Sequence, residues 1–157
     1  MTFIEASHVG FVVADLDVAT AEFEDRLGVR WAAVQERHMP VSTADGVVRA
    51  DFRFTYSTTT TGPMLIELIE GQEGTPWWPG AAEWAFHHVG FWSDELVADS
   101  QRLDEEGVPL QATGGEGPSP RGFAYHQLQH GPLIELVDAA RRPLFLNWLA
   151  GGEFPQA

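Results

Sequence analysis

Hydrophobic and polar positions in the first 70 residues predict a strand, a helix and three further strands. Residues 7–13 form an apolar run rich in β-branched and aromatic side chains, which is typical of a buried strand. Apolar side chains then recur at four-residue spacing over residues 19–27, after the capping candidates Asp15 and Asp17 and before Gly28, so this segment is predicted to be a helix. Further strands are predicted at 34–36, 50–56 and 64–69. One module therefore reads β-α-β-β-β.

The second part of the chain repeats this pattern. The sequence HVGF at residues 8–11 returns at 88–91, and GPMLIEL at 62–68 returns as GPLIEL at 131–136. Strands are predicted at 87–92, near Leu110, at 123–128 and at 133–137, with a helix at 94–106 capped by Ser93. Internal repeats of this kind indicate a duplicated unit. We therefore predict one domain, with module 1 at about 3–71, a connector at 72–84, module 2 at about 85–138 and a C-terminal helix at about 143–150.

Two loops stand out by composition. The connector holds Gly, Pro and three of the six Trp residues, so we expect aromatic packing to hold it in place. Residues 114–122 form a Gly/Pro loop before a strand that leads to the second repeat's Glu, and functional residues often lie on such loops. Pro143 is suited to the first turn of the last helix.

Each repeat carries one His and one Glu. Side chains alternate between the two faces of a strand, so His8 and Glu67 each share a face with apolar neighbours, as do their counterparts. An unpaired carboxylate on such a face costs roughly several kcal/mol, and a divalent cation removes that cost. If the modules pack with pseudo-twofold symmetry, His8, Glu67, His88 and Glu135 surround one centre. Two neutral imidazoles and two carboxylates then form a neutral set with Zn²⁺, Ni²⁺, Co²⁺ or Mn²⁺, with positions open for substrate or water.

The other histidines have simpler interpretations. A lone His on an apolar strand is usually a packed core residue, and the duplication is what favours metal binding by His8 and His88. His87 is predicted to face the helix side as a packed or hydrogen-bonded residue. Ordinary surface histidines are predicted at three loop or strand-end positions: His38, His126 and His130.

Composition excludes several classes. With 9 Lys+Arg against 23 Asp+Glu, the formal charge of −14 disfavours nucleic acid as a partner. The absence of Cys removes disulfides and thiolate ligands, which leaves His and carboxylates as the strong metal ligands. No basic segment opens the sequence, and no apolar run approaches the roughly 18 residues of a membrane span. These features predict a cytoplasmic protein without membrane contact.

The repeated words HVGF, HHVGF and IEL resemble those of the vicinal oxygen chelate superfamily, which includes glyoxalase I, methylmalonyl-CoA epimerase, extradiol dioxygenases and bleomycin-resistance proteins. The likeness extends from His8 to about Val137. It implies an α+β fold, in which two tandem βαβββ modules form a cupped mixed sheet with helices outside. It also implies one divalent metal ion on the concave face, with ligands at the positions matched by His8, Glu67, His88 and Glu135.

The resemblance also bears on the reaction. Four ligands are similar to the lyase and isomerase branch, whereas the dioxygenases typically use two His and one carboxylate. The epimerase carries a further Glu in the turn between the second and third strands, and residues 42–47 at the corresponding place contain only Asp45 as an acid. This departure argues against methylmalonyl-CoA as the substrate.

A metal-dependent lyase or isomerase/epimerase is therefore implied, acting through a metal-stabilised enolate on a small substrate with vicinal oxygens. Glu135 or Glu67 is the expected base, because a ligand Glu can leave the metal and reach a chelated substrate. Trp92, on the same strand face as His88, and Phe123 or Tyr125, opposite Glu135, are expected to line an apolar pocket.

Alternatives remain open at this point. The pairing register of the last hairpin decides whether Tyr125 or His126 faces the pocket, and the sequence leaves both possible. For Trp92, a role as a core aromatic residue is as well supported as a role in the pocket. Arg121 is a candidate clamp for an anionic group, with a solvated surface arginine as the alternative. A metal-free, drug-resistance-type binding protein is the second function class, and the acidic balance would suit a cationic ligand. An extradiol-type dioxygenase ranks third, and the sequence is compatible with a homodimer.

Overall fold

The computed structural model describes residues 5–58 and 62–154. Within these ranges the strands are β1 (Glu5–Val13), β2 (Gln35–Thr43), β3 (Gly46–Tyr56), β4 (Leu65–Gly71), β5 (Trp84–Ser93), β6 (Leu110–Gly114), β7 (Phe123–Gln127) and β8 (Leu133–Asp138). The helices are α1 (Leu16–Leu27), α2 (Leu96–Glu105) and α3 (Arg142–Leu149), and a 3₁₀ turn, η1 (Ala139–Arg141), precedes α3. The start of module 1 expected at residue 3 lies outside the described residues, as do residues 59–61, between the strands predicted at 50–56 and 64–69.

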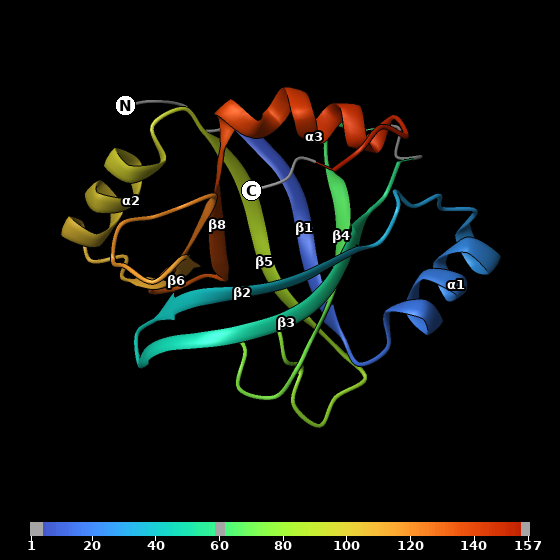
Figure 1. The fold of residues 1–157 in the computed structure, drawn as a ribbon, viewed down its shortest axis with the longest axis horizontal. Helices are drawn as coiled ribbons and strands as arrows, with labels where there is room; N and C mark the ends of the chain where they lie inside the picture. The colour runs from blue at the N-terminus through green and yellow to red at the C-terminus, as the bar shows by residue number, and fades with distance from the viewer. Residues whose placement is uncertain (1–4, 59–61, 155–157) are drawn as a thin grey trace.

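The strands form a closed ring in the order β1-β4-β3-β2-β6-β7-β8-β5. Strands β1 and β4 pair in parallel, as do β5 and β8, whereas β1 and β5 pair antiparallel where the two modules meet. Helices α1 and α2 lie on opposite outer sides of the ring, and α3 lies across one end (Figure 1). The predicted α+β fold, a cupped mixed sheet with helices outside, is confirmed.

The two faces of the strands bury different clusters. On the outside, Leu16 of α1 packs with Val13 and Leu68, and Leu103 of α2 packs with Leu136. Burying a side chain of this size contributes roughly 1.5–3 kcal/mol, so each helix is held by the apolar outer face of its own module. The inside of the ring holds a separate, largely aromatic cluster from both modules.

Strands β2 and β3 are longer than predicted. They pair from Gln35 opposite Phe54 to Thr43 opposite Gly46, around the predicted turn at 44–46. Polar side chains obscure the apolar alternation over much of this hairpin, because one of its faces is open to water. Backbone pairing, which the side-chain pattern does not record, extends the strands.

The expected start of the second helix at residue 94 and its cap by Ser93 were both wrong. Helix α2 begins at Leu96, and its N-cap residue Glu95 makes no side-chain capping bond. The Ser93 hydroxyl donates to Asp99 at 2.7 Å instead, because Ser93 lies two positions before the cap residue Glu95. In α1 the Asp15 side chain caps the helix by accepting from the Val18 amide, but Leu27 at its end is 71% exposed and does not join the core.

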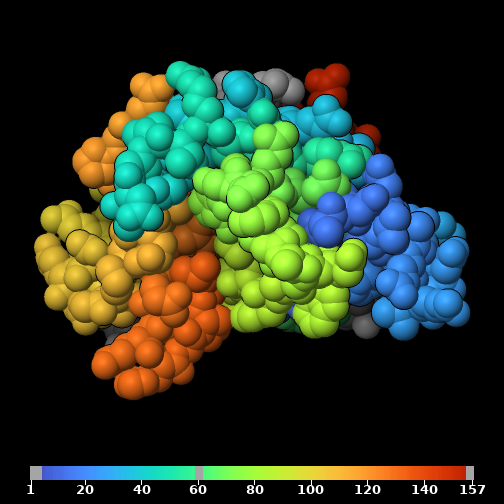
Figure 2. All heavy atoms as spheres, turned by 90° about the horizontal axis from the view of Figure 1, so that it is seen from below, coloured from blue at the N-terminus to red at the C-terminus, as the bar shows by residue number. Residues whose placement is uncertain are grey.

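The connector is held by aromatic packing, as predicted. The indole of Trp77 is buried inside the ring, 4.1 Å from the ring of Phe52 between centroids, and its Nε1 donates to the Tyr125 hydroxyl at 3.0 Å. Figure 2 views the molecule from the side opposite α3 and shows the connector (yellow-green) lying across the middle of that face. Buried Trp148 of α3 enters the same inner cluster. No helix among the described residues is long and apolar enough to cross a membrane.

Candidate metal centre and its cavity

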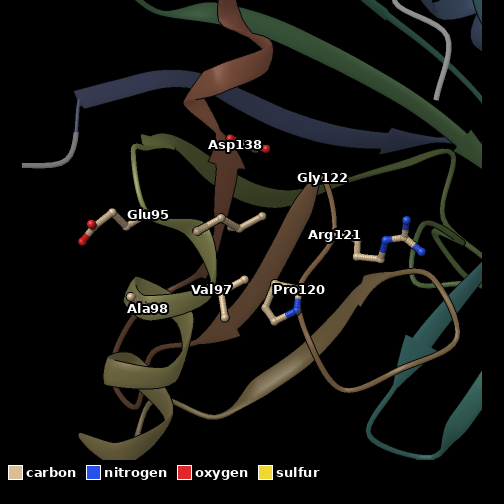
Figure 3. A pocket seen from close by; sticks show the side chains of 8 residues that line it. Glu95, Val97, Ala98, Pro120, Arg121, Gly122 and Asp138 are labelled. Carbon is tan, nitrogen blue, oxygen red and sulfur yellow. The ribbon is translucent and has the colours of Figure 1, made fainter.

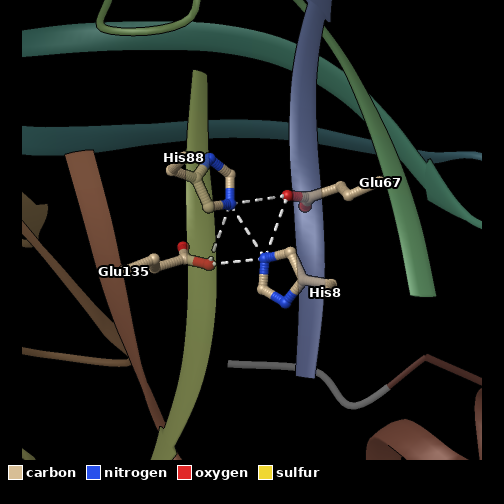
Figure 4. Close-up of side chains that lie close together, drawn as sticks. All are labelled: His8, Glu67, His88 and Glu135. Atoms are coloured by element: carbon tan, nitrogen blue, oxygen red, sulfur yellow. Dashed lines mark hydrogen bonds and ion pairs between the residues drawn. The ribbon is translucent and has the colours of Figure 1, made fainter. Parts of the chain in front are cut away.

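Four buried side chains meet inside the ring, one from each of the strands β1, β4, β5 and β8 (Figure 4). His8 Nε2 lies 2.8 Å from His88 Nε2. Glu135 Oε2 lies 2.9 Å from His8 Nε2 and 3.3 Å from His88 Nε2, while Glu67 Oε2 lies 3.4 and 3.2 Å from the same two atoms. The structure thus brings together the four residues that the repeats mark as ligands.

The glycine in each HVGF repeat makes this approach possible. Across the β1–β5 pair, His8 lies opposite Gly90 and Gly10 lies opposite His88. A Cβ atom at Gly10 would overlap the His88 ring, and one at Gly90 would overlap the His8 ring. Each module therefore supplies one imidazole and the space for the other module's imidazole, which is a reason for His and Gly to recur two residues apart.

The residue before each of these histidines orients its ring. Ser7 Oγ lies 2.8 Å from His8 Nδ1, and His87 Nδ1 lies 2.9 Å from His88 Nδ1. His87 Nε2 can only donate to the carbonyl of Pro76, at 2.9 Å, so a neutral His87 must accept at Nδ1 the proton of His88 Nδ1. When His88 is neutral, it is thereby fixed as the tautomer whose bare Nε2 faces the cluster.

The pKa of His87 supports this assignment. Burial and the positive charge of His88 lower the pKa of His87 to about 4, so His87 is neutral near pH 7. A neutral imidazole with its Nε2 proton committed to a carbonyl has one acceptor left, which is the atom that faces His88.

Each glutamate of the cluster is buried beside a tyrosine. Tyr56 lies opposite Glu67 in the β3–β4 register, and Tyr125 lies opposite Glu135 in the β7–β8 register. Burial raises the pKa of both tyrosines, and the charge of Glu67 and Glu135 adds to this effect, so both phenols stay protonated. The Tyr125 hydroxyl, which accepts from Trp77, has its proton free for the carboxylate.

The cluster attracts positive charge. Burial alone lowers the pKa of His88, but the charge of Glu135 and hydrogen bonds to Glu135 and Glu67 raise it to about 9. The pKa of His8 is raised by the same two carboxylates against the effect of burial. Burial in turn raises the pKa of each carboxyl group, and the two histidines outweigh it and lower both values.

The donor set fits a divalent ion. Glu67 Oε2 and Glu135 Oε2 are buried, and both lie within 3.4 Å of the two imidazole nitrogens. All four ligand atoms lie within 4.8 Å of one another, and ligands held at roughly 2.0–2.3 Å from one ion lie roughly 3 to 4 Å apart. Two imidazole nitrogens and two carboxylate oxygens are ligands that suit Zn²⁺ and its first-row neighbours. The four residues could therefore hold a metal.

The cluster lies in a cavity of about 440 Å³ inside the ring. This volume falls in the range typical of small-molecule sites. Aromatic side chains from both modules, the connector and the C-terminal segment line it: Phe52, Phe54, Tyr56, Trp77, Trp92, Phe123, Tyr125, Phe145 and Phe154. Its carboxylates are Glu5, Glu67 and Glu135, and Glu5 is bound by both terminal nitrogens of Arg142 at 2.8 Å.

A family model described as the Glyoxalase/Bleomycin resistance protein/Dioxygenase superfamily matches residues 7–125. The chain belongs to this superfamily. The matched segment contains three of the four clustered residues, His8, Glu67 and His88. A comparison with curated proteins gave no match.

Solved structures of several superfamily members share the fold. The methylmalonyl-CoA epimerase of Mycobacterium tuberculosis has a TM-score of 0.60 at 24% identity, over 85% of this chain and 87% of that chain. A variant of the Streptomyces coelicolor epimerase, in complex with 2-nitronate-propionyl-CoA, has a TM-score of 0.60 at 20% identity, over 87% and 98%. A variant of 4-hydroxymandelate synthase from Streptomyces coelicolor has a TM-score of 0.56 at 17% identity, over 88% and 39%. At these identities the likeness shows the fold alone.

The other predicted site residues of this superfamily member also line the cavity. They are Trp92, Arg121, Phe123 and Tyr125. Of the two alternatives in β7, Tyr125 is the residue that faces the cavity. His126 points outward, where its Nε2 lies 2.8 Å from Ser100 Oγ of α2.

Two of the other histidines differ from their expected surroundings, and a third agrees with them. His126 is fully buried and its Nδ1 donates to the Val108 carbonyl, so it was wrongly predicted to be a surface residue. His87, expected on the helix side, contacts His88 and the connector instead. His38 is exposed and pairs with Asp51, which agrees with a surface histidine.

Tyr56, Arg37 and Arg141 also line the cavity but were not predicted. The signal for Tyr56 was present, because FTY at residues 54–56 returns as FAY at 123–125, and Tyr56 precedes Glu67 by 11 residues where Tyr125 precedes Glu135 by 10. Both cavity arginines lie outside the repeated words, so no internal repeat marks them.

A second depression, of about 550 Å³, lies between the first turn of α2 and the loop before β7 (Figure 3). Its charged groups are Glu95, Arg121 and Asp138, and Asp138 Oδ1 already accepts from the Ala140 amide. With no histidine in its lining, it offers no set of ligands comparable to the cluster.

Proposed function

We propose that the protein is a metal-dependent lyase or isomerase/epimerase, which moves a proton on a small substrate with vicinal oxygens. The observation that carries this proposal is the buried set of two histidines and two glutamates, whose Oε2 atoms lie within 3.4 Å of the imidazole nitrogens, at the wall of a largely aromatic cavity. His8, Glu67, His88 and Glu135 are the proposed ligands of one Zn²⁺, Ni²⁺, Co²⁺ or Mn²⁺ ion. When bound there, such an ion polarises substrate oxygens and stabilises the negative charge of an enolate.

Glu67 or Glu135 is the proposed base. They are the cavity carboxylates without an arginine partner among the described residues, since Glu5 is bound by Arg142. Each has an oxygen within about 3.4 Å of an imidazole nitrogen and stays ionised because the histidines lower its pKa, so either can accept a proton from a substrate held at the cluster. Tyr56 and Tyr125 can hold these carboxylates in position between turnovers.

Methylmalonyl-CoA is not the substrate we favour. No residue of the turn at 42–47 lines the cavity, and Asp45 is not among its charged groups. The β2–β3 hairpin contributes Arg37, Met39, Phe52 and Phe54 to the cavity instead, so it supplies charge of the opposite sign and apolar surface.

Metal content of the purified protein is the first test. We expect about one divalent ion per chain, lost in a His8→Ala, His88→Ala double variant. Purified protein that neither contains nor takes up such an ion, with both glutamates paired by arginine in a crystal structure, would contradict the proposal.

Deuterium exchange tests the reaction without knowledge of the substrate. Ligands with vicinal oxygens and an acidic C–H, such as α-hydroxythioesters and hemithioacetals of α-ketoaldehydes, should exchange that hydrogen faster with metal-loaded than with metal-free protein. Glu135→Gln should slow exchange by about 10²-fold or more if it is the base. Glu67→Gln is the matched control, because it alters the same ligand type in the other module.

A metal-free binding protein is the second candidate, and the aromatic cavity supports it. Tight binding of a bulky apolar compound without exchange of any hydrogen would favour it. An extradiol-type dioxygenase ranks third; oxygen uptake with a catechol on the iron-loaded protein would favour that reaction.

A further inference from the structure

The arginines of this acidic chain are concentrated at its cavity. The chain has no lysine, and four of its nine arginines line the one cavity that holds the cluster: Arg37, Arg121, Arg141 and Arg142. A formal charge of −14 makes this concentration notable, because 23 carboxylates are available to pair with nine cations. The field inside the cavity mouth therefore differs in sign from that of the average surface.

Three of these arginines form no ion pair within the described part of the chain. Arg49, Arg53, Arg102 and Arg142 each form an ion pair with a glutamate or aspartate. Among the described residues, none of the ion pairs includes Arg37, Arg121 or Arg141. These three cations face the cavity from β2, from the loop before β7 and from η1.

The three side chains gather at one end of the cavity. The Arg37 guanidinium carbon lies 4.3 Å from the centre of the Phe154 ring, which holds the side chain at the wall. Burial and the charge of Arg141 lower the pKa of Arg37, so these two cations are neighbours. A Cβ at Gly122 would lie 3.3 Å from Arg141 Nη1, which places Arg141 against the loop of Arg121. Figure 3 shows the Arg121 side chain directed away from Glu95 and Asp138.

The space between the arginines and the cluster is apolar. Phe52, Trp92, Phe123 and Phe145 provide flat surfaces from four different elements. The cluster residues are almost fully buried, whereas Arg121 is exposed and Arg37 and Arg141 are half-buried. The cavity therefore runs from a cationic mouth, past aromatic walls, to the acidic and imidazole groups at its base.

We propose that the cavity takes a small organic acid with an aromatic or similarly bulky apolar body, whose carboxylate lies between Arg37, Arg141 and Arg121 at the mouth. The guanidinium groups bind a carboxylate through paired N–H donors, and the anion relieves the repulsion between Arg37 and Arg141. The aromatic walls enclose the body. The end of the bound acid that lies at the cluster is the end that reacts. Only this statement rests on the proposed function. A cationic ligand, which the net charge of the chain would suggest, is disfavoured.

Binding to metal-free protein tests this substrate class, because no carboxylate can then bind through a metal at the cluster. The probes are 3-phenylpropanoate and 4-phenylbutanoate, each compared by calorimetry with its carboxamide, which has the same shape without the charge. We expect the carboxylates to bind about 10- to 100-fold more tightly than the amides, the effect of a charge-assisted hydrogen-bond pair. Propanoate, which lacks the aromatic body, should bind more weakly than either aromatic acid.

Variants locate the charge. Arg141→Gln and Arg37→Gln should remove most of the preference for the carboxylate, and Arg141→Lys should keep part of it. Arg49→Gln is the matched control, since Arg49 pairs with Glu116 outside the cavity. Because Arg37 also packs on Phe154, circular dichroism of each variant must match the parent, and Arg121→Gln, at an exposed position, provides a test independent of folding.

Two outcomes would overturn the inference. One is equal binding of carboxylate and amide, or a preference that survives loss of Arg37 and Arg141. The other is tight, arginine-dependent binding of coenzyme A or inorganic phosphate with none of the aromatic acids, which would assign the mouth to phosphate groups. Failure of deuterium exchange with carboxylate binding intact would reject the proposed function and leave this inference standing.

Discussion

At the scale of single residues, the cluster depends on neighbours that never touch a metal. His87 accepts a hydrogen bond from His88 Nδ1 and donates one to the Pro76 carbonyl. The proton of a neutral His88 therefore stays on Nδ1 and leaves Nε2 without a proton. A His87→Leu substitution removes this acceptor and lets His88 change tautomer. We expect metal affinity to fall about 10- to 100-fold, the usual effect of losing such a partner.

Competition with a chromophoric chelator measures this affinity. His130→Ala, at an exposed position, is the control for loss of a histidine as such. Wild-type affinity in His87→Leu would show that the orientation of His88 has another source.

The two glycines that admit the imidazoles give a second prediction. In Gly10→Ala the new methyl group overlaps the His88 ring, so His88 must leave its place in the cluster. We expect loss of metal binding together with a destabilisation of about 1–3 kcal/mol, the usual cost of overpacking. Gly117→Ala is the control, because a Cβ there meets no atom within 4 Å. Metal titration and denaturant unfolding give the two quantities, and normal metal binding by Gly10→Ala would refute the packing argument.

The four clustered residues could be predicted from the sequence because each repeat contains one His and one Glu, at matching positions of short sequence motifs. Tyr125 could not be separated from His126, because a shift of one residue in the β7–β8 register exchanges the two faces. Arg37 and Arg141 could not be found because their role depends on which distant segments meet at the cavity mouth, which no local pattern encodes.

At the scale of elements, the sequence located the repeated strands and α1 but misjudged the β2–β3 hairpin and the start of α2. Both errors arise where backbone pairing or a side-chain hydrogen bond outweighs the preference of the local sequence for a given secondary structure. The hairpin is held by an unbroken antiparallel ladder, and Ser93 bonds to Asp99 within the first turn of α2 instead of capping it.

Helix α3 provides a prediction at this scale. Trp148 is 1% exposed and packs on Tyr56 and Phe145, at ring distances of 6.0 and 5.7 Å. Trp148→Ala should lower the free energy of unfolding by about 3–5 kcal/mol, as expected for a fully buried tryptophan. Metal affinity should change little, because α3 supplies none of the four clustered residues.

Leu144→Ala on the same helix is the control, since Leu144 is 55% exposed. Denaturant unfolding of both variants measures the difference. A Trp148→Ala protein as stable as Leu144→Ala would mean that the packing of α3 across the end of the ring contributes little to stability.

At the scale of the whole molecule, average charge describes the surface and not the site. The net charge of −14 disfavours nucleic acid, yet Arg37, Arg121 and Arg141, which form no ion pair with a described residue, face the internal cavity. The base of that cavity attracts positive charge, because its two carboxylates raise the pKa of His8 and His88 and so keep protons on them when no metal is bound.

This proton binding couples metal, pH and stability. The pKa of His88 is about 9 in the folded metal-free protein against 6.5 for an ordinary histidine, so its contribution to stability is fully present below pH 6.5 and is lost as the pH rises through 9. The glutamates, whose pKa values are lowered, lose their contribution only on acidification below about pH 4.5. Metal-free protein should therefore lose on the order of 2–3 kcal/mol of stability between pH 6.5 and 9.

A bound divalent ion replaces these protons, so metal-loaded protein should lose little stability over the same range, and apparent metal affinity should rise with pH up to about 9. Thermal unfolding of both forms at several pH values measures the effect, as a gap in Tm that widens with pH. His88→Gln removes the titrating group and should flatten the profile of the metal-free form. A gap that stays constant from pH 6 to 9 would show that the cluster binds metal without displacing protons, which would contradict the charge pairing seen between His8, His88 and the two glutamates.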